Sequence, residues 1–119
     1  MQKKVIISVA PVGPWGAGEG NPLTPEEVSE QVIACAKAGA AMVHMHCRDA
    51  SGALTTDLTT FNKTADLIKA SCDIILEAST GGLSSMTALA RTLPAPNRHA
   101  QLASLNVGSF NFGDNVYLH

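Results

Sequence analysis

Two histidines, His44 and His46, lie two positions apart in a short apolar run. If this run is a β-strand, residues two apart project from the same side of it, so both imidazoles can ligate one metal ion. The pair also stands at the end of its run, and α/β proteins build active sites at the carboxyl ends of strands. We therefore predict that His44 and His46 bind a divalent metal. The alternative is a pair of strand histidines that bond to neighbours or face solvent.

The residues around this pair have other expected roles. A catalytic zinc takes three protein ligands, and no third ligand is evident near the pair. Cys47 alternates to the opposite side of the strand, which favours packing. Asp49 is a candidate to orient an imidazole or to pair with Arg48. Glu77 interrupts an apolar run, and a buried carboxylate needs a partner, for which a neighbouring strand is the expected source. The remaining histidines have no companions and are expected on the surface: His99 and His119.

A second motif, Ser79-Thr80-Gly81-Gly82, also follows an apolar run and precedes a helical segment. Glycines in such a turn allow backbone N–H groups to face a pocket, and a helix N-terminus attracts anions. The motif is therefore a candidate site for a substrate carboxylate or a phosphate. A tight βα turn that needs glycine for its dihedral angles explains it equally well.

A third candidate site follows the fourth apolar run. Ser104 and Asn106 share one side of this run, at its carboxyl end. Both can donate hydrogen bonds to a carbonyl or carboxylate group of a substrate. The alternative is that they cap the backbone of the loop that follows.

These candidates depend on strands and helices that alternate along the chain. Apolar, β-rich runs predict four strands, at residues 5–10, 41–46, 74–78 and 102–106. Helical spacing predicts three helices, from Thr24 to a stop at Gly39 and at residues 59–70 and 84–92. The first helix has the clearest start, because Thr24 can cap it and Pro25 fits its first position. Glu27 completes a capping box.

Strands that alternate with helices at this rhythm indicate βα units and a parallel sheet. The almost continuously apolar runs are typical of strands covered on both faces. A closed (β/α)₈ barrel takes about 250 residues, so a chain of 119 residues can form an open α/β domain or half of a barrel. No GxGxxG follows the first strand, which removes support for a nucleotide-binding sheet. We therefore predict one domain, residues 1–119, that forms the N-terminal half of a TIM barrel. Its open strand edges favour association into a homo-oligomer.

Composition excludes several classes of protein. Eight Lys and Arg against ten Asp and Glu give a net charge of −2, and aromatic residues make up 4%. This balance gives no sign of the basic surface that binds nucleic acid or an anionic membrane. No apolar run approaches the roughly 20 residues of a membrane-spanning helix, and the first apolar stretch ends at Pro11, as a strand does and a secretory signal does not. Three widely spaced cysteines predict no disulfide framework, so we expect a reducing, cytoplasmic location.

Three motifs stand in a specific order and spacing: HMHCRD at 44–49, STGG at 79–82 and SLNVGSFNFGD at 104–114. Together they resemble the β-keto acid cleavage enzymes, whose best-known type is the 3-keto-5-aminohexanoate cleavage enzyme of lysine fermentation. The TPEE helix start and the AGAAMVH approach to the histidines fit the same pattern. The resemblance covers essentially the whole chain but only the N-terminal half of the family's length.

The resemblance implies a zinc-dependent acyl exchange, in which a β-keto acid and acetyl-CoA become acetoacetate and a new acyl-CoA. It assigns the metal to His44 and His46, where zinc polarises the keto carbonyl as a Lewis acid. It assigns the keto acid to four further residues: Ser79, Gly82, Ser104 and Asn106.

Two features depart from the family. Its third metal ligand, a glutamate, and the Arg and Asp that generate the enolate lie in the family's second half, so we expect this chain alone to be inactive. The glutamate with which the amino-keto acid members meet an ammonium group falls at about Trp15 here, which favours an apolar or neutral β-keto acid. Two alternatives stay open: a non-catalytic fragment, and a small anion-binding α/β module that uses the 79–82 turn.

Overall fold

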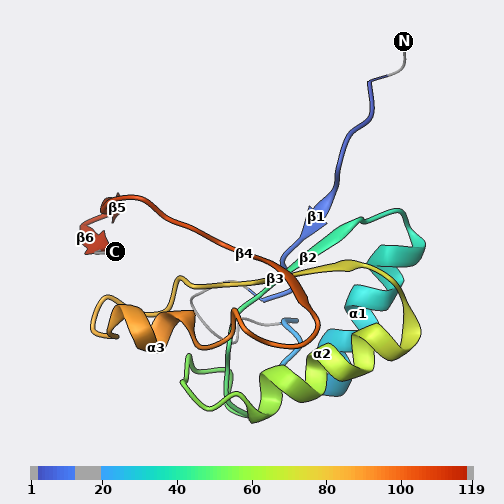
Figure 1. Ribbon diagram of the computed structural model, residues 1–119, viewed down its shortest axis with the longest axis horizontal. Coiled ribbons are helices and arrows are strands. Elements are labelled where there is room, and N and C mark those ends of the chain that lie inside the picture. Colours follow the sequence, from blue (N-terminus) through green and yellow to red (C-terminus); the bar gives the residue numbers. More distant parts are fainter. Residues whose placement is uncertain (1–2, 13–19, 118–119) are drawn as a thin grey trace.

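The computed structural model describes residues 3–12 and 20–117 (Figure 1). One sheet contains four parallel strands, which neighbour one another in chain order. They are β1 (Ser8–Val9), β2 (Met42–Met45), β3 (Ile75–Ala78) and β4 (Ala100–Ala103). A helix follows each of the first three: α1 (Pro25–Lys37), α2 (Thr59–Ser71) and α3 (Ala88–Thr92). The predicted βα units and parallel sheet are confirmed, and this sequential order is that of consecutive units in a (β/α)₈ barrel.

Helix α1 begins where its capping box predicts. Thr24 Oγ1 accepts a hydrogen bond from the Glu27 N–H (3.2 Å), and Glu27 Oε2 accepts one from the Thr24 N–H (3.0 Å). Pro25 occupies the first helical position, where an N–H group would have no helical partner. Gly39 takes a φ of 108° just after the helix, which ends it as predicted.

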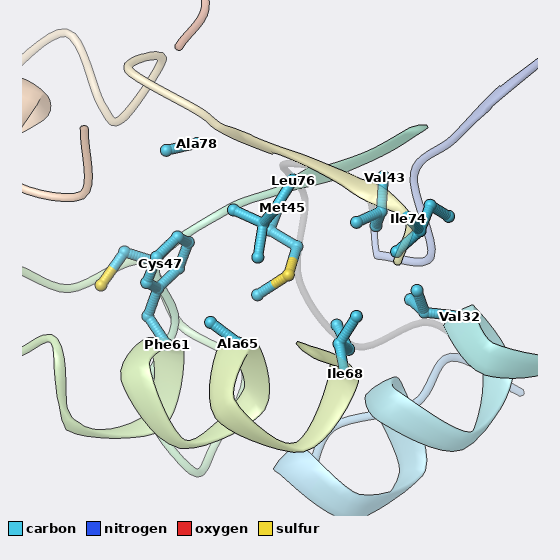
Figure 2. Packing of buried hydrophobic residues seen from close by; sticks show 10 residues of the cluster. All are labelled: Val32, Val43, Met45, Cys47, Phe61, Ala65, Ile68, Ile74, Leu76 and Ala78. Atoms are coloured by element: carbon cyan, nitrogen blue, oxygen red, sulfur yellow. The ribbon is translucent and has the colours of Figure 1, made fainter. Parts of the chain in front are cut away.

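Helix α2 packs against β2 and β3 and forms the centre of the core (Figure 2). Its residues Phe61, Ala65 and Ile68 are at most 1% exposed and point toward the sheet. Helix α1 adds Val32 to the same cluster. The sheet and the residues beside it supply the other members: Val43, Met45, Cys47, Ile74, Leu76 and Ala78.

The helices cover β2 and β3 on one face only. Val43 and Met45 of β2 are buried, as are Leu76 and Ala78 of β3. The residues that alternate with them are not buried: Met42, His44, Ile75 and Glu77. The expected cover on both faces is therefore wrong for the described residues. The apolar runs conceal an alternation that keeps His44 and Glu77 out of the core.

Strand β1 is shorter than predicted. The Ile7 carbonyl accepts a hydrogen bond from the Ala41 N–H (2.9 Å), at the beginning of the β2 ladder. Residues before Ile7 have no counterpart on that strand, because the chain comes into β2 from the turn at Gly39. Val5 and Ile6 are accordingly 81% and 77% exposed.

Strand β4 begins two residues earlier than predicted and ends earlier too. The Ser104 N–H donates to the Ala78 carbonyl (3.1 Å), and the ladder stops there because β3 gives way to the turn at 79–82. Ser104 and Asn106 therefore lie beyond the strand, and their predicted place on one strand face is wrong.

Helix α3 begins at Ala88, not at residue 84. The Thr87 hydroxyl accepts a hydrogen bond from the Ala90 N–H (3.2 Å) and caps the helix. Before it, the Met86 N–H donates to the Leu83 carbonyl in a separate turn (2.9 Å). The Thr87 hydroxyl, which lies inside the predicted helix, thus fixes the start of α3 at Ala88.

A hairpin near the C-terminus is absent from the predicted elements. β5 (Phe110–Phe112) pairs antiparallel with β6 (Asn115–Tyr117) in a separate sheet. Gly113 takes a φ of 56° between them, as the first position of a tight hairpin turn favours. The Gly-Asp pair between two short runs is the signal that identifies this hairpin.

His99 has companions, contrary to prediction. Its Nε2 lies 2.8 Å from Asp66 Oδ1, which also accepts a hydrogen bond from Arg98 (2.7 Å). The Asn97 amide donates to Asn62 on the same helix (2.7 Å). These contacts join the segment before β4 to α2, across a sequence separation that no local pattern bridges.

The predictions for Trp15 and His119 lie outside the described residues.

The outer strands β1 and β4 pair with no further strand in the part of the chain that the structure describes. The N-terminal segment and the β5–β6 hairpin extend away from α1 and α2 (Figure 1). Several large apolar side chains near the two edges are more than half exposed: Val5, Ile6, Ile7, Leu105 and Val107. The predicted open edges are therefore present. Among the described residues, no helix has both the length and the apolar character to cross a bilayer.

Cys47 packs in the core, as predicted, and generates a pH dependence. It is 7% exposed, and its thiol donates to the Asp57 carbonyl (3.2 Å). Burial, with a smaller contribution from the Asp57 carboxylate, raises the pKa of this thiol to about 11 from an ordinary value near 9. Between these values the unfolded state binds fewer protons than the folded state, so the free energy of unfolding falls as pH rises.

We expect Cys47→Ser to flatten this alkaline fall, because the hydroxyl keeps the donor but does not ionise in the same window. Urea denaturation at several pH values between 9 and 11 measures it. An equal slope for the wild-type chain and the variant would contradict the assignment.

Candidate metal and substrate site

The predicted site residues lie at or just beyond the carboxyl ends of three neighbouring strands. His44 lies in β2 and His46 just beyond it, Ser79 follows β3, and Ser104 follows β4. Parallel strands end at the same edge of a sheet. The Ser79 N–H accordingly donates to the Met45 carbonyl (2.8 Å), which joins the end of β3 to the end of β2.

The two histidine rings lie together, edge to face, with centroids 5.0 Å apart and planes at 79°. Zinc lies about 2.0–2.1 Å from a ligating nitrogen, which is itself about 1.1 Å from its ring centroid. Two imidazoles at a tetrahedral angle around one zinc therefore have centroids about 5 Å apart. The observed centroid separation of His44 and His46 is compatible with a shared ion, and it is also the ordinary separation of an edge-to-face ring pair.

The surroundings of His46 favour the neutral imidazole, which can ligate a metal, over the protonated imidazolium. Burial first, and then the neighbouring His44 and Arg48, lower the pKa of His46 to about 4. The ring is therefore neutral near neutral pH, which is the form that binds a metal. Within residues 3–12 and 20–117, no three or more His, Cys, Asp or Glu side chains are arranged to hold an ion.

Glu77 lies opposite His44 in the parallel register of β2 and β3. Its Oε2 is 3.3 Å from His44 Nδ1, and the two side chains are 20% and 25% exposed. The predicted partner on a neighbouring strand is therefore confirmed. Sequence reasoning found the unusual carboxylate but not its partner, because strand register is not visible in the sequence.

Asp49 shapes the turn that follows the histidines. Its Oδ1 accepts hydrogen bonds from the Ser51 N–H (2.8 Å), the Ser51 hydroxyl (2.6 Å) and the Ala53 N–H (3.1 Å). Arg48 is buried and its guanidinium donates to the Gly52 carbonyl across the same turn. Both residues thus stabilise the loop beside the site.

The turn at 79–82 closes on itself. The Ser79 hydroxyl accepts a hydrogen bond from the Gly81 N–H (3.2 Å), and Gly82 takes a φ of 59°. The expected junction with a helix N-terminus is wrong, because α3 starts only at Ala88. The turn by itself therefore does not have the helix-dipole anion site that its sequence favours.

Ser104 joins the ends of β3 and β4. Its hydroxyl accepts a hydrogen bond from the Thr80 N–H (2.9 Å), and the Thr80 hydroxyl donates to the Ser104 carbonyl (2.7 Å). Asn106 lies farther along and is exposed. The structure thus brings Ser104 to the 79–82 turn and leaves Asn106 at the surface.

Arg91 is a candidate site residue that the sequence did not reveal. With His46, Ser79 and Gly82 it lines a cavity of about 20 Å³. A Cβ on Gly82 would lie 2.8 Å from Arg91 Cγ, so the missing side chain makes room for the arginine stem. The sequence does show that Arg91 is a charged residue inside the predicted third helix, but no local pattern shows that it faces the end of β3.

Comparison with known proteins decides the family. The family described as beta-keto acid cleavage enzyme matches residues 4–119. This chain belongs to the β-keto acid cleavage enzyme family. The family resemblance read from the three motifs is therefore confirmed.

Relatives in the family differ in substrate. The chain is 40% identical over 116 residues to the 3,5-dioxohexanoate:acetyl-CoA acetone transferase of Paraburkholderia graminis, covering 94% of this chain and 37% of that protein. It is 36% identical over 124 residues to a 3-keto-5-aminohexanoate cleavage enzyme of Fusobacterium nucleatum, covering 100% and 45%. A 3-oxoadipate:acetyl-CoA acetyltransferase of Cupriavidus necator is 36% identical over 121 residues, covering 98% and 42%. The chain thus spans less than half of each relative's length. With the four sequential parallel strands, this agrees with the predicted half-barrel.

The contact between Gly82 and Arg91 predicts a specific coupling. Gly82→Ala should lower the free energy of unfolding by roughly 1–3 kcal/mol, from the positive φ and from the short contact with Arg91. In an Arg91→Ala background the contact is relieved, so the same substitution should cost less. Urea denaturation of the wild-type chain and the three variants of this cycle measures the difference, and equal costs in both backgrounds would refute the contact.

Proposed function

We propose that this chain supplies the metal-binding and substrate-binding half of a zinc-dependent β-keto acid cleavage enzyme. The reaction exchanges acyl groups, so that a β-keto acid and acetyl-CoA become acetoacetate and a new acyl-CoA. The supporting observation is the His44–His46 pair, whose 5.0 Å ring separation suits one zinc, in a chain of this family. The names of two of the relatives compared above also contain acetyl-CoA.

His44 and His46 would hold the zinc, and the bound ion would act as a Lewis acid on the keto carbonyl. His46 suits this role because its lowered pKa keeps the ring neutral. The third ligand that a catalytic zinc takes would come from outside the described residues.

The residues at the ends of β3 and β4 would bind the keto acid. The Ser79 hydroxyl accepts from the Gly81 N–H, which leaves its O–H oriented as a donor for a substrate oxygen. Gly82 lies in the same cavity as Ser79 and His46. Ser104 and Asn106 would complete the set, Ser104 being held by Thr80 and Asn106 being open to solvent.

We propose an apolar or neutral β-keto acid as the substrate. Trp15 stands at about the position where amino-keto acid members of the family carry a glutamate for an ammonium group. An uncharged indole cannot offset that charge, so selectivity should favour a substrate without it.

We also propose that the protein assembles as a homo-oligomer. Unpaired strand edges and exposed apolar side chains favour association. In the part of the chain that the structure describes, both occur at or beside β1 and β4.

Removing both histidines should abolish zinc binding. In equilibrium dialysis followed by elemental analysis, the wild-type chain should retain zinc, and the His44→Ala/His46→Ala variant should retain none above background. His99→Ala is the matched control, because its ring bonds to Asp66 away from the site. Equal zinc contents in the wild-type chain and the double variant would refute the metal assignment.

The 119-residue chain alone should form no acetoacetate from acetyl-CoA and a neutral β-keto acid, because its described residues provide two zinc ligands and not three. A coupled assay for acetoacetate measures this. Turnover that disappears in the double histidine variant would show that the chain is sufficient and would overturn the expectation.

A further inference from the structure

Glu77 is the acidic residue in a strand whose other members, Ile75, Leu76 and Ala78, are apolar. A carboxylate in such a strand is costly unless a partner satisfies it. The register of β2 and β3 sets it directly opposite His44, and both side chains are partly buried, at 20% and 25% exposure. This juxtaposition joins a carboxylate to one of the two candidate metal ligands.

The contact involves one particular ring nitrogen. Glu77 Oε2 lies 3.3 Å from His44 Nδ1. A neutral imidazole carries its proton on either nitrogen, and an ionised carboxylate can only accept a hydrogen bond. Glu77 therefore favours the tautomer with the proton on Nδ1, which leaves the lone pair of Nε2 available to a metal.

The neighbouring residues support a role in orientation. The His46 ring packs edge to face against His44, so His44 is held by an aromatic contact as well as by Glu77. Asp49, the other carboxylate near the pair in sequence, is engaged by Ser51 and Ala53. Among the carboxylates that the structure describes, Glu77 is thus in position to select the His44 tautomer.

We propose that Glu77 is a positioning residue that holds His44 with its Nδ1 proton toward the carboxylate and its Nε2 toward the zinc. The inference rests on the proposed function, because it gives His44 the part of a metal ligand. It adds to that function a carboxylate that acts on the metal through a histidine and does not itself bind the ion.

The first test reads the tautomer in the metal-free 119-residue chain. Nitrogen-15 NMR of labelled histidine should show His44 protonated on Nδ1 in the wild-type chain. In Glu77→Leu it should show a shift toward the Nε2-protonated form that free histidine favours. The same tautomer in both proteins would overturn the proposal. Because no metal is present, this result is independent of whether the chain binds zinc.

The second test measures zinc affinity by competition with a chelating dye. Glu77→Leu should weaken zinc binding roughly 10–100-fold, as expected for a carboxylate that orients a ligating histidine. Glu77→Gln should retain part of the affinity, because its amide oxygen can still face the His44 Nδ1–H, without the charge of the carboxylate. The matched control is Glu30→Gln, which removes an exposed carboxylate from α1 and should leave affinity unchanged.

Two results of the affinity test would contradict the proposal. An unchanged affinity in Glu77→Leu would remove the positioning role. A loss in Glu77→Gln as large as that in His44→Ala would make Glu77 a direct ligand instead. If the wild-type chain binds no zinc, the proposed function fails, and the tautomer measurement still decides whether Glu77 orients His44.

Discussion

The packing of α2 against β2 and β3 decides which side chains reach the candidate site. Phe61 lies against the face of the sheet that carries Val43 and Met45, and strand alternation then sends His44 to the opposite face. A shift of one residue would exchange His44 with Val43. It would bury an imidazole under a helix without a partner, which is unfavourable. The apolar core and the candidate metal site therefore depend on the same register.

The second constraint is that the strands are parallel. Their carboxyl ends meet at one edge, so segments separated by more than twenty residues come into contact without any long-range sequence signal. Backbone hydrogen bonds from Ser79 to Met45 and from Ser104 to Ala78 draw the three strand ends together. The same serines are candidates for substrate binding, and their hydroxyls already accept bonds from Gly81 and Thr80. These bonds restrict the hydroxyls, which would lower the entropy cost of binding a substrate there.

The open edges of the sheet connect the fold with the family. Apolar residues such as Ile6 and Val107 are exposed where β1 and β4 lack a further strand among the described residues. In a closed barrel each strand is paired on both sides, so this exposure agrees with the chain covering 37–45% of its relatives' length. The face of the sheet that carries His44 and Glu77 is also the face that the described helices leave uncovered. Covering this face would therefore affect both the stability of the chain and the candidate site.

The sequence by itself determined the features that depend on a few neighbouring residues. The capping box at Thr24, the same-side spacing of His44 and His46 and the family motifs all follow from local geometry. Only the tertiary structure decided that Glu77 faces His44, that His99 pairs with Asp66 and that β4 ends before Ser104. Each of these depends on how distant segments align, and that alignment is set by the packing of buried side chains and by where a partner strand stops. A local sequence pattern shows neither how buried side chains pack nor where a partner strand ends.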